Sequence, residues 1–191
     1  MVLLPKDHKE VLRGRPLVSA VDAPGTNLSR VLAHCLKPLL QQLNAHLEST
    51  AAFVCALSNL AAENCHFGSL DFVNLYGSIP LTGESNVFEV SGDFFEQHKR
   101  ETVLVNLSRG QLIKLLRLAT SFDTVLIRGV LYRQTNGLAM GNNLSPILAI
   151  IYMNYVETEL LRRSGDVVRA WHRYIDDVFV ISSNPLNECW G

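Results

Sequence analysis

The stretch AWHRYIDDVFVISS (residues 170–183) places Asp176 and Asp177 side by side between two runs of aromatic and β-branched residues. Such runs are typical of strands, so the stretch predicts a hairpin that carries both carboxylates at its turn. Neighbouring carboxylates repel each other and resist burial, because an unpaired buried charge is costly. The pair therefore predicts either a site for a cation or a turn that is simply exposed to solvent.

Asp71 is the best candidate for a third carboxylate, because it lies near the end of another apolar strand, HFGSLDFVNLY (residues 66–76). Two strands side by side in one sheet would bring Asp71 beside Asp176. Magnesium prefers hard oxygen ligands of this kind, and two bound ions can stabilise the attacking and leaving oxygens of a phosphoryl transfer. Taken alone, the IDD sequence is explained equally well by an exposed, Asp-rich turn.

Helices and strands are mixed along the rest of the chain. RPLVSAV (residues 15–21) predicts a short strand, and Thr26 or Asn27 can cap the helix that follows it. Apolar residues on one face extend that helical pattern over residues 28–47, and a second apolar helix is expected over about residues 50–64.

The second half of the chain continues the mixed pattern. Pro80 marks the start of a third expected helix, Ser108 can cap a fourth, and a hairpin should turn near Arg128 and Gly129. A glycine-rich loop then leads into a helix from about Ser145 to Arg163, with Pro146 in its first turn, before the hairpin that carries the aspartates. We find no repeat or linker, so one mixed α and β domain is expected.

Composition sets further limits on the chain. With 48 % hydrophobic and 18 % charged residues among 191, it has an ordinary globular balance. The four cysteines form no CxxC pair and no metal-ligand spacing, so they are expected to be reduced thiols of an intracellular protein, and no structural zinc is expected. We expect no signal peptide and no membrane span, because the longest apolar run, ILAIIYM, is far below the roughly 20 residues required.

Charge is segregated along the chain although the formal net charge is only −1. Residues 38–98 contain seven acidic residues and no Lys or Arg, whereas the flanking segments are rich in Lys and Arg. The folded chain could therefore present basic faces around an acidic centre, an arrangement that suits a polyanion held near bound cations. Ordinary solvated faces explain the charge pattern equally well.

Four blocks of sequence carry a resemblance to a known family. Three of these blocks resemble the palm motifs of reverse transcriptases: SLDFVNLYGSIP, GLAMGNNLSPILAIIYMNYVE and WHRYIDDVFV. Their residues are most similar to those of Penelope-like retroelements, which are related to telomerase. LPKDHKEVLRGRPLVSAVDAPGTNLSRVL looks like the fingers segment before those motifs. The resemblance implies an α+β reverse transcriptase domain over residues 1–191, a right-hand polymerase palm (about 49–191) with partial fingers (about 1–48) and no thumb.

The resemblance also implies the roles of individual residues. Asp71 and Asp176 would be the principal ligands of two Mg²⁺ ions, with Asp177 in the same charge cluster and the backbone carbonyl of Phe72 assisting. Tyr76 would stack under the incoming sugar and reject a 2′-hydroxyl, although an ordinary core tyrosine is the alternative.

The remaining implied roles concern the nucleotide and the loop beside it. Arg15 would bind the triphosphate with Lys6 nearby, and Gly141 would let the backbone approach the nascent base pair. Met140 stands where many reverse transcriptases have glutamine. Asn142 and Asn143 replace the Ser-Pro expected in Penelope-like elements, which puts the packing of that loop in question.

The function expected from these observations is RNA-directed DNA polymerisation, with an RNA template, a DNA primer and deoxynucleoside triphosphates as partners and the nucleus as location by family analogy. The chain ends soon after Asp177, so the thumb and the endonuclease segment of many Penelope-like elements are expected to be missing. The alternative is a truncated or co-opted retroelement remnant that keeps the fold and binds nucleic acid without catalysis. A nucleotidyl cyclase explains neither the fingers block nor the glycine-rich loop.

Overall fold

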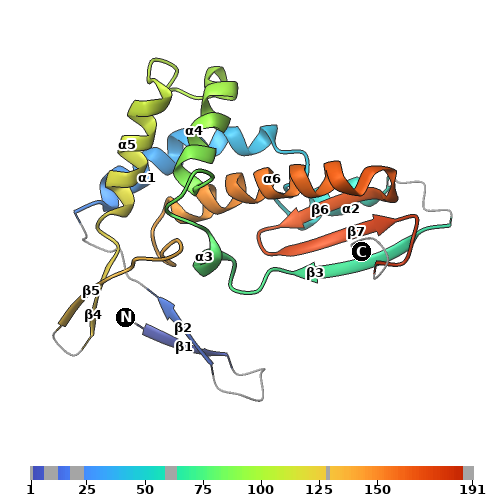
Figure 1. Cartoon of the computed structure of the whole chain (residues 1–191), viewed down its shortest axis with the longest axis horizontal. Coiled ribbons are helices and arrows are strands. Elements are labelled where there is room, and N and C mark those ends of the chain that lie inside the picture. Colours follow the sequence, from blue (N-terminus) through green and yellow to red (C-terminus); the bar gives the residue numbers. More distant parts are fainter. Residues whose placement is uncertain (1, 7–12, 18–23, 59–63, 128–129, 187–191) are drawn as a thin grey trace.

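A three-stranded antiparallel sheet in the order β3-β7-β6 carries the predicted carboxylates (Figure 1). It is formed by β3 (His66–Asp71) and by the hairpin of β6 (Val168–Tyr174) and β7 (Asp177–Ser182). The computed structural model describes residues 2–6, 13–17, 24–58, 64–127 and 130–186. The strand predicted before Asp71 and the final hairpin are thus confirmed, although β3 ends at Asp71 and does not continue to Tyr76.

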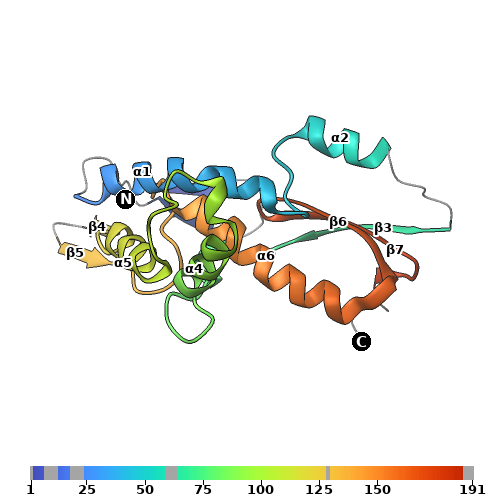
Figure 2. The same ribbon diagram turned by 90° about the horizontal axis from the view of Figure 1, so that it is seen from above.

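The two faces of this sheet are covered to different extents. Val178 and Val180 of β7 are buried in a small cluster with side chains of α6 (Ser145–Ser164). α2 (Thr50–Ser58) lies on the opposite side of the sheet from α6 (Figure 2) and contains no buried residue. The face away from α6 is therefore the more open one.

The main hydrophobic core lies among the helices at the other end of the molecule (Figure 1). It includes fully buried side chains such as Leu39, Phe95, Leu112 and Leu148. The elements that contribute to it are α1 (Thr26–Leu36), the 3₁₀ helix η1 (Lys37–Gln42), α3 (Leu75–Ser78), α4 (Val87–His98), α5 (Arg109–Thr120) and the first half of α6. Short 3₁₀ helices η2 (Lys99–Glu101) and η3 (Gly165–Val167) follow α4 and α6.

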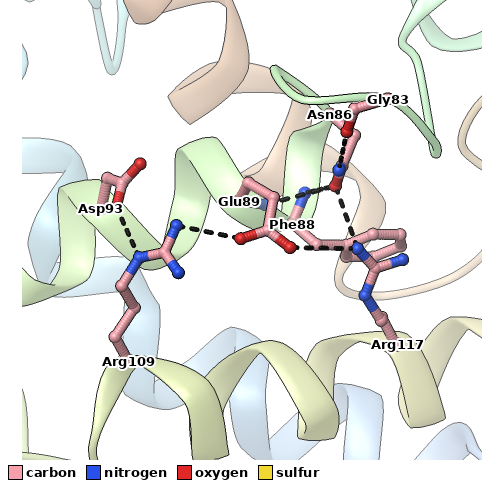
Figure 3. Close-up of polar contacts among 7 residues, drawn as sticks. All are labelled: Gly83, Asn86, Phe88, Glu89, Asp93, Arg109 and Arg117. Atoms are coloured by element: carbon pink, nitrogen blue, oxygen red, sulfur yellow. Dashed lines mark hydrogen bonds and ion pairs between the residues drawn. The ribbon is translucent and has the colours of Figure 1, made fainter.

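Two arginines of α5 hold one carboxylate of α4 between them (Figure 3). Glu89 accepts hydrogen bonds from Arg109 at 2.9 Å and from Arg117 at 3.2 Å, and Asp93 also accepts one from Arg109. The guanidinium of Arg117 lies 4.7 Å from the ring centroid of Phe88. These pairs are partly exposed, so they set the register of the two helices more than they add stability.

Several predicted helix boundaries were right because short-range signals define them. Ser108 caps α5 through a capping box with Gln111, and α6 begins at Ser145 as expected. Other boundaries were wrong. α4 begins at Val87 with Asn86 as its cap rather than at Pro80, because the amide oxygen of Asn86 accepts hydrogen bonds from the first free N–H groups.

The first helix also differs from its prediction. It begins at Thr26 with Gly25 as N-cap, and neither Thr26 nor Asn27 occupies the cap position. A Cβ at Gly25 would lie 2.9 Å from the carbonyl oxygen of Ala119 on α5, which explains why glycine fits there. The apolar pattern predicted over residues 28–47 divides into α1 and η1, because Pro38 cannot continue an α-helix.

The remaining predictions fall partly outside the described residues. β1 (Val2–Lys6) pairs with β2 (Arg13–Leu17), whereas residues 18–21 of the predicted strand lie outside the described residues. β4 (Thr124–Ile127) and β5 (Val130–Arg133) form the predicted hairpin, whose turn at Arg128 and Gly129 lies outside the described residues. The second predicted helix is described as α2 over Thr50–Ser58, residues 59–63 of its predicted range lie outside the described residues, and Asn64 has a positive φ of 55°.

Among the cysteines within the described residues, Cys35 is buried, Cys55 exposed and Cys65 partly exposed, whereas Cys189 lies outside them. No helix in the described part of the chain has the length and apolar character needed to cross a membrane.

Candidate active site

Asp71 and Asp177 lie directly opposite each other on neighbouring strands of the sheet. They are Cα partners in the antiparallel register of β3 and β7. The next rung is hydrogen-bonded, since the Phe72 N–H donates to the carbonyl oxygen of Asp176 at 3.2 Å. The Asp71–Asp177 rung therefore has the non-hydrogen-bonded geometry, in which opposed side chains lie closest together on one face.

Asp176 occupies the two-residue turn between β6 and β7, together with Ile175. Ile175 has a φ of 56°, and it is the only one of the two turn residues with positive φ. That pattern matches a type II′ turn, which usually has glycine at this first position. The structure thus brings Asp71, Asp176 and Asp177 to one end of the sheet, but it opposes Asp71 to Asp177 where the sequence suggested Asp176.

Like charges directly opposite each other destabilise a sheet unless a cation offsets them. No ion pair among the described residues includes Asp71, Asp176 or Asp177. Nor do the described residues contain a group of three or more His, Cys, Asp or Glu side chains arranged to hold a metal ion. The three carboxylates therefore do not form a preformed set of three ligands, although the opposed pair supplies the hard oxygen donors that Mg²⁺ prefers.

Tyr76 lies close to this charge cluster. Burial raises the pKa of its hydroxyl above the usual 10.0, and the negative charge of Asp176 raises it further. The phenol therefore stays neutral at physiological pH. Phe72 packs between the helical core and the smaller sheet core, which fixes the segment that joins Asp71 to Tyr76.

The glycine-rich loop packs against the same segment. The Leu138 N–H donates to the carbonyl oxygen of Tyr76 at 2.7 Å. Gly137 has a φ of 70°, and a Cβ there would lie 2.5 Å from both the Tyr76 carbonyl oxygen and the Cα of Gly77. Gly141, four residues on, has a φ of 117°. The loop thus meets the short helix that carries Tyr76 in a contact that only glycine permits.

The model of the family described as reverse transcriptase (RNA-dependent DNA polymerase) matches residues 6–189. The chain belongs to the reverse transcriptase family. The match includes all four blocks named above except the first two residues of the fingers block. No curated protein matched the sequence.

Solved structures of similar fold include telomerases. The chain resembles apo telomerase from Candida tropicalis, truncated from its C-terminal domain, with a TM-score of 0.56 and 18 % identity over 86 % of this chain and 35 % of that one. It also resembles telomerase from Candida albicans in complex with a fragment of telomeric RNA, with a TM-score of 0.52 and 16 % identity over 86 % and 31 %. At these identities the likeness concerns the fold, and the reverse transcriptase domain spans about a third of either telomerase chain.

Two predicted nucleotide-binding residues of the reverse transcriptase domain lie on its N-terminal hairpin. Lys6 is the last residue of β1, where it pairs with Arg13, and Arg15 of β2 pairs with Leu4. The hairpin is separate from the three-stranded sheet (Figure 1). The contribution of Lys6 and Arg15 to triphosphate binding stays a prediction.

Asn142 explains how this reverse transcriptase domain holds the loop in which Ser-Pro was expected. Its side chain is buried, and its amide donates to the Ala119 carbonyl oxygen at 3.3 Å and to an Asp123 carboxylate oxygen at 2.8 Å. Its own oxygen accepts from the Leu144 N–H at 2.9 Å, just before α6. Asn142 therefore joins the loop to the end of α5 and to the start of α6.

We expect Asn142→Ala to lower the free energy of unfolding by about 2 kcal/mol near pH 8, because it leaves buried polar groups without partners. Burial raises the pKa of Asp123, and the hydrogen bond from Asn142 lowers it in part. That bond favours ionised Asp123, so its contribution exists above the pKa of Asp123 and is lost as pH falls through it. Urea unfolding over a pH series should show the deficit shrinking with acidity. Asn143→Ala, at the exposed neighbour, should change stability little at any pH.

Sequence reasoning missed three residues around this site. Gly137 was not singled out, although the Asn136-Gly137 dipeptide is a turn signal. Arg173 and Glu157 were also missed, and they are almost fully buried at 0 % and 1 % exposure. Their signal was a charged residue at a position where strand alternation or a helical face predicts an apolar one.

Proposed function

We propose that this chain is the polymerase domain of a Penelope-like retroelement and that it adds deoxynucleotides to the 3′ end of a DNA primer on an RNA template. The observation that carries the proposal is the opposed pair Asp71 and Asp177, with Asp176 in the adjoining turn beside Tyr76. The family membership supports it. We propose the palm for residues of about 49–191 and the fingers for about 1–48.

The carboxylates fit the cofactor expected for such an enzyme. Mg²⁺ keeps several waters and is usually bound by one or two carboxylates together with substrate phosphates, so a preformed set of three ligands is not required. Asp71, Asp176 and Asp177 would hold two ions, with the carbonyl oxygen of Phe72 assisting. When bound, these ions supply positive charge to the phosphates and increase the acidity of the primer 3′-hydroxyl.

The other site residues would bind and orient the nucleotide. Arg15 suits the triphosphate because its planar guanidinium can donate two parallel hydrogen bonds to phosphate oxygens, and Lys6 adds a point charge. Gly141 leaves room beside the nascent base pair. Tyr76 presents a neutral ring to the sugar, and the contact of Gly137 and Leu138 with its backbone fixes its position.

Primer extension tests this function. The purified chain is incubated with a DNA primer annealed to an RNA template, Mg²⁺ and the four deoxynucleoside triphosphates. We expect products that grow by the complement of the template and that vanish when EDTA removes Mg²⁺. Extension that does not depend on the template sequence would contradict the proposal.

Tyr76→Ala should reduce the preference for deoxynucleotides over ribonucleotides by ~10- to 100-fold, because the ring no longer clashes with a 2′-hydroxyl. The measurement is the ratio of kcat/KM for one deoxynucleotide and its ribonucleotide. Tyr76→Phe keeps the ring and is the matched control, with selectivity near that of the wild type. Equal selectivity in Tyr76→Ala and the wild type would assign Tyr76 to the core only.

A further inference from the structure

A buried ion pair lies behind the turn that carries the carboxylates. The Nε of Arg173, on β6, donates to Oε1 of Glu157, on α6, at 2.6 Å. The indole N–H of Trp171 donates to the same oxygen at 2.9 Å. Arg173 is 0 % exposed and Glu157 1 %. The pair thus joins the sheet to α6 on the face away from Asp177.

The other two guanidinium nitrogens of Arg173 also donate hydrogen bonds. Nη1 donates to the carbonyl oxygen of Ile175 at 3.1 Å, and Nη2 donates to that of Ile150 at 3.2 Å. The backbone of Arg173 is fixed as well. Its N–H donates to the carbonyl oxygen of Ala45 at 2.7 Å, and its carbonyl oxygen accepts from the N–H of Leu47 at 2.8 Å. The donor that reaches Ile175 therefore has little freedom to move.

Ile175 is the residue that needs such support. Its φ of 56° places a β-branched side chain in the left-handed region, which is unfavourable for it. A strained backbone of this kind persists only where surrounding contacts over-determine it. The hydrogen bond from Arg173 to the carbonyl oxygen just before Asp176 is one of those contacts.

Stability alone does not explain this ion pair. Burying two charges costs about as much as their attraction returns, and apolar side chains of similar size often do as well. The second carboxylate oxygen of Glu157, Oε2, is buried and has no hydrogen-bond partner within the described chain. What an apolar pair could not supply is a fixed N–H directed at the turn.

We propose that Arg173, held by Glu157, is a positioning residue that fixes the turn between β6 and β7 and thereby the orientation of Asp176 and Asp177. The inference rests on the proposed function, because it assigns these two carboxylates to metal binding. Arg173 does not contact the reacting groups, and it acts only through the backbone of Ile175.

The test separates positioning from folding with the variants Arg173→Met and Arg173→Met/Glu157→Met in the whole chain. The single variant leaves a buried carboxylate unpaired and should lower Tm strongly, whereas the double variant should regain most of the loss. Mn²⁺ affinity, measured by electron paramagnetic resonance, should still be ~10-fold or more weaker in the double variant. The Mg²⁺ concentration for half-maximal extension should rise by a similar factor. Wild-type Mn²⁺ affinity in the double variant would overturn the inference.

Three further variants make every outcome decisive. Trp171→Phe removes a donor to Glu157 but no bond to the turn, so Mn²⁺ affinity should not change, and a loss equal to that of the double variant would overturn the inference. If the double variant does not fold, Arg173→Lys takes its place, because lysine keeps a charge for Glu157 but lacks the planar set of donors that holds Ile175 and Ile150. Wild-type Mn²⁺ affinity in Arg173→Lys would also overturn the inference. Asp71→Asn should lose Mn²⁺ binding. If it does not, the proposed function itself fails, and this inference fails with it.

Discussion

Asp71→Asn and Asp176→Asn are each expected to lower primer extension by at least ~100-fold. Each change removes a charged oxygen donor from the proposed Mg²⁺ site, and the lost charge stabilisation is worth several kcal/mol in the transition state. Asp177→Asn should cost less, since the resemblance to reverse transcriptases gives Asp176 the direct role. The measurement is kcat/KM for one deoxynucleotide at saturating Mg²⁺.

Protein stability provides the control for this prediction. Removing one of the opposed carboxylates relieves repulsion between Asp71 and Asp177, so the free energy of unfolding should stay constant or rise by up to about 1 kcal/mol. Asp166→Asn makes the same charge change at an exposed position in η3 and should keep full activity. Undiminished extension by folded Asp176→Asn would refute the assigned role. The opposed register makes the Asp177 result informative, because a loss equal to that of Asp176→Asn would give both residues direct roles.

Gly137→Ala is expected to destabilise the protein by about 2–4 kcal/mol, the second largest effect. The added Cβ would lie 2.5 Å from the Tyr76 carbonyl oxygen and the Cα of Gly77, and φ is 70°. These neighbours are backbone atoms, so the loop and the short helix must move apart, and overpacking adds to the strain of a left-handed alanine. Because Tyr76 moves with its backbone, the preference for deoxynucleotides should fall too. Urea unfolding measures the first effect and nucleotide competition the second.

Another glycine separates the two causes. Gly83 has a φ of 94°, and a Cβ there would meet nothing within 4 Å. Gly83→Ala therefore reports the cost of the left-handed backbone alone, about 1 kcal/mol, without a steric clash. If Gly137→Ala were no less stable than Gly83→Ala, the result would contradict the close contact between the loop and α3.

Where local chemistry suffices, the sequence predicted this protein well. The capping box at Ser108 and the start of α6 depend on hydrogen bonds between residues three or four apart, so the pattern contains all the partners. The strand ending at Asp71 and the final hairpin follow from β-rich runs of the same short range. The motifs around them predicted the reverse transcriptase family, which the family comparison confirmed.

Boundaries and contacts that depend on distant segments were not predictable in this way. Gly25 is the N-cap of α1, and a Cβ there would clash with the carbonyl oxygen of Ala119 on α5, a neighbour that no local pattern reveals. Glu157 and Arg173 read as ordinary charged residues until α6 packs on the sheet and buries both. Burial removes both charged groups from water and leaves them hydrogen-bonded to each other.

By itself, then, the sequence determined which residues carry the chemistry: two adjacent aspartates in a turn, a third at a strand end, and a tyrosine and a glycine-rich loop nearby. Only the tertiary structure decided how they meet. The register of β3 against β7 opposes Asp71 to Asp177. Strand pairing fixes both which residues lie opposite each other and which face of the sheet each side chain occupies, and neither strand contains that information alone. The support of the turn by Arg173 follows from the same packing, since its guanidinium reaches Ile175 only when α6 holds it from behind.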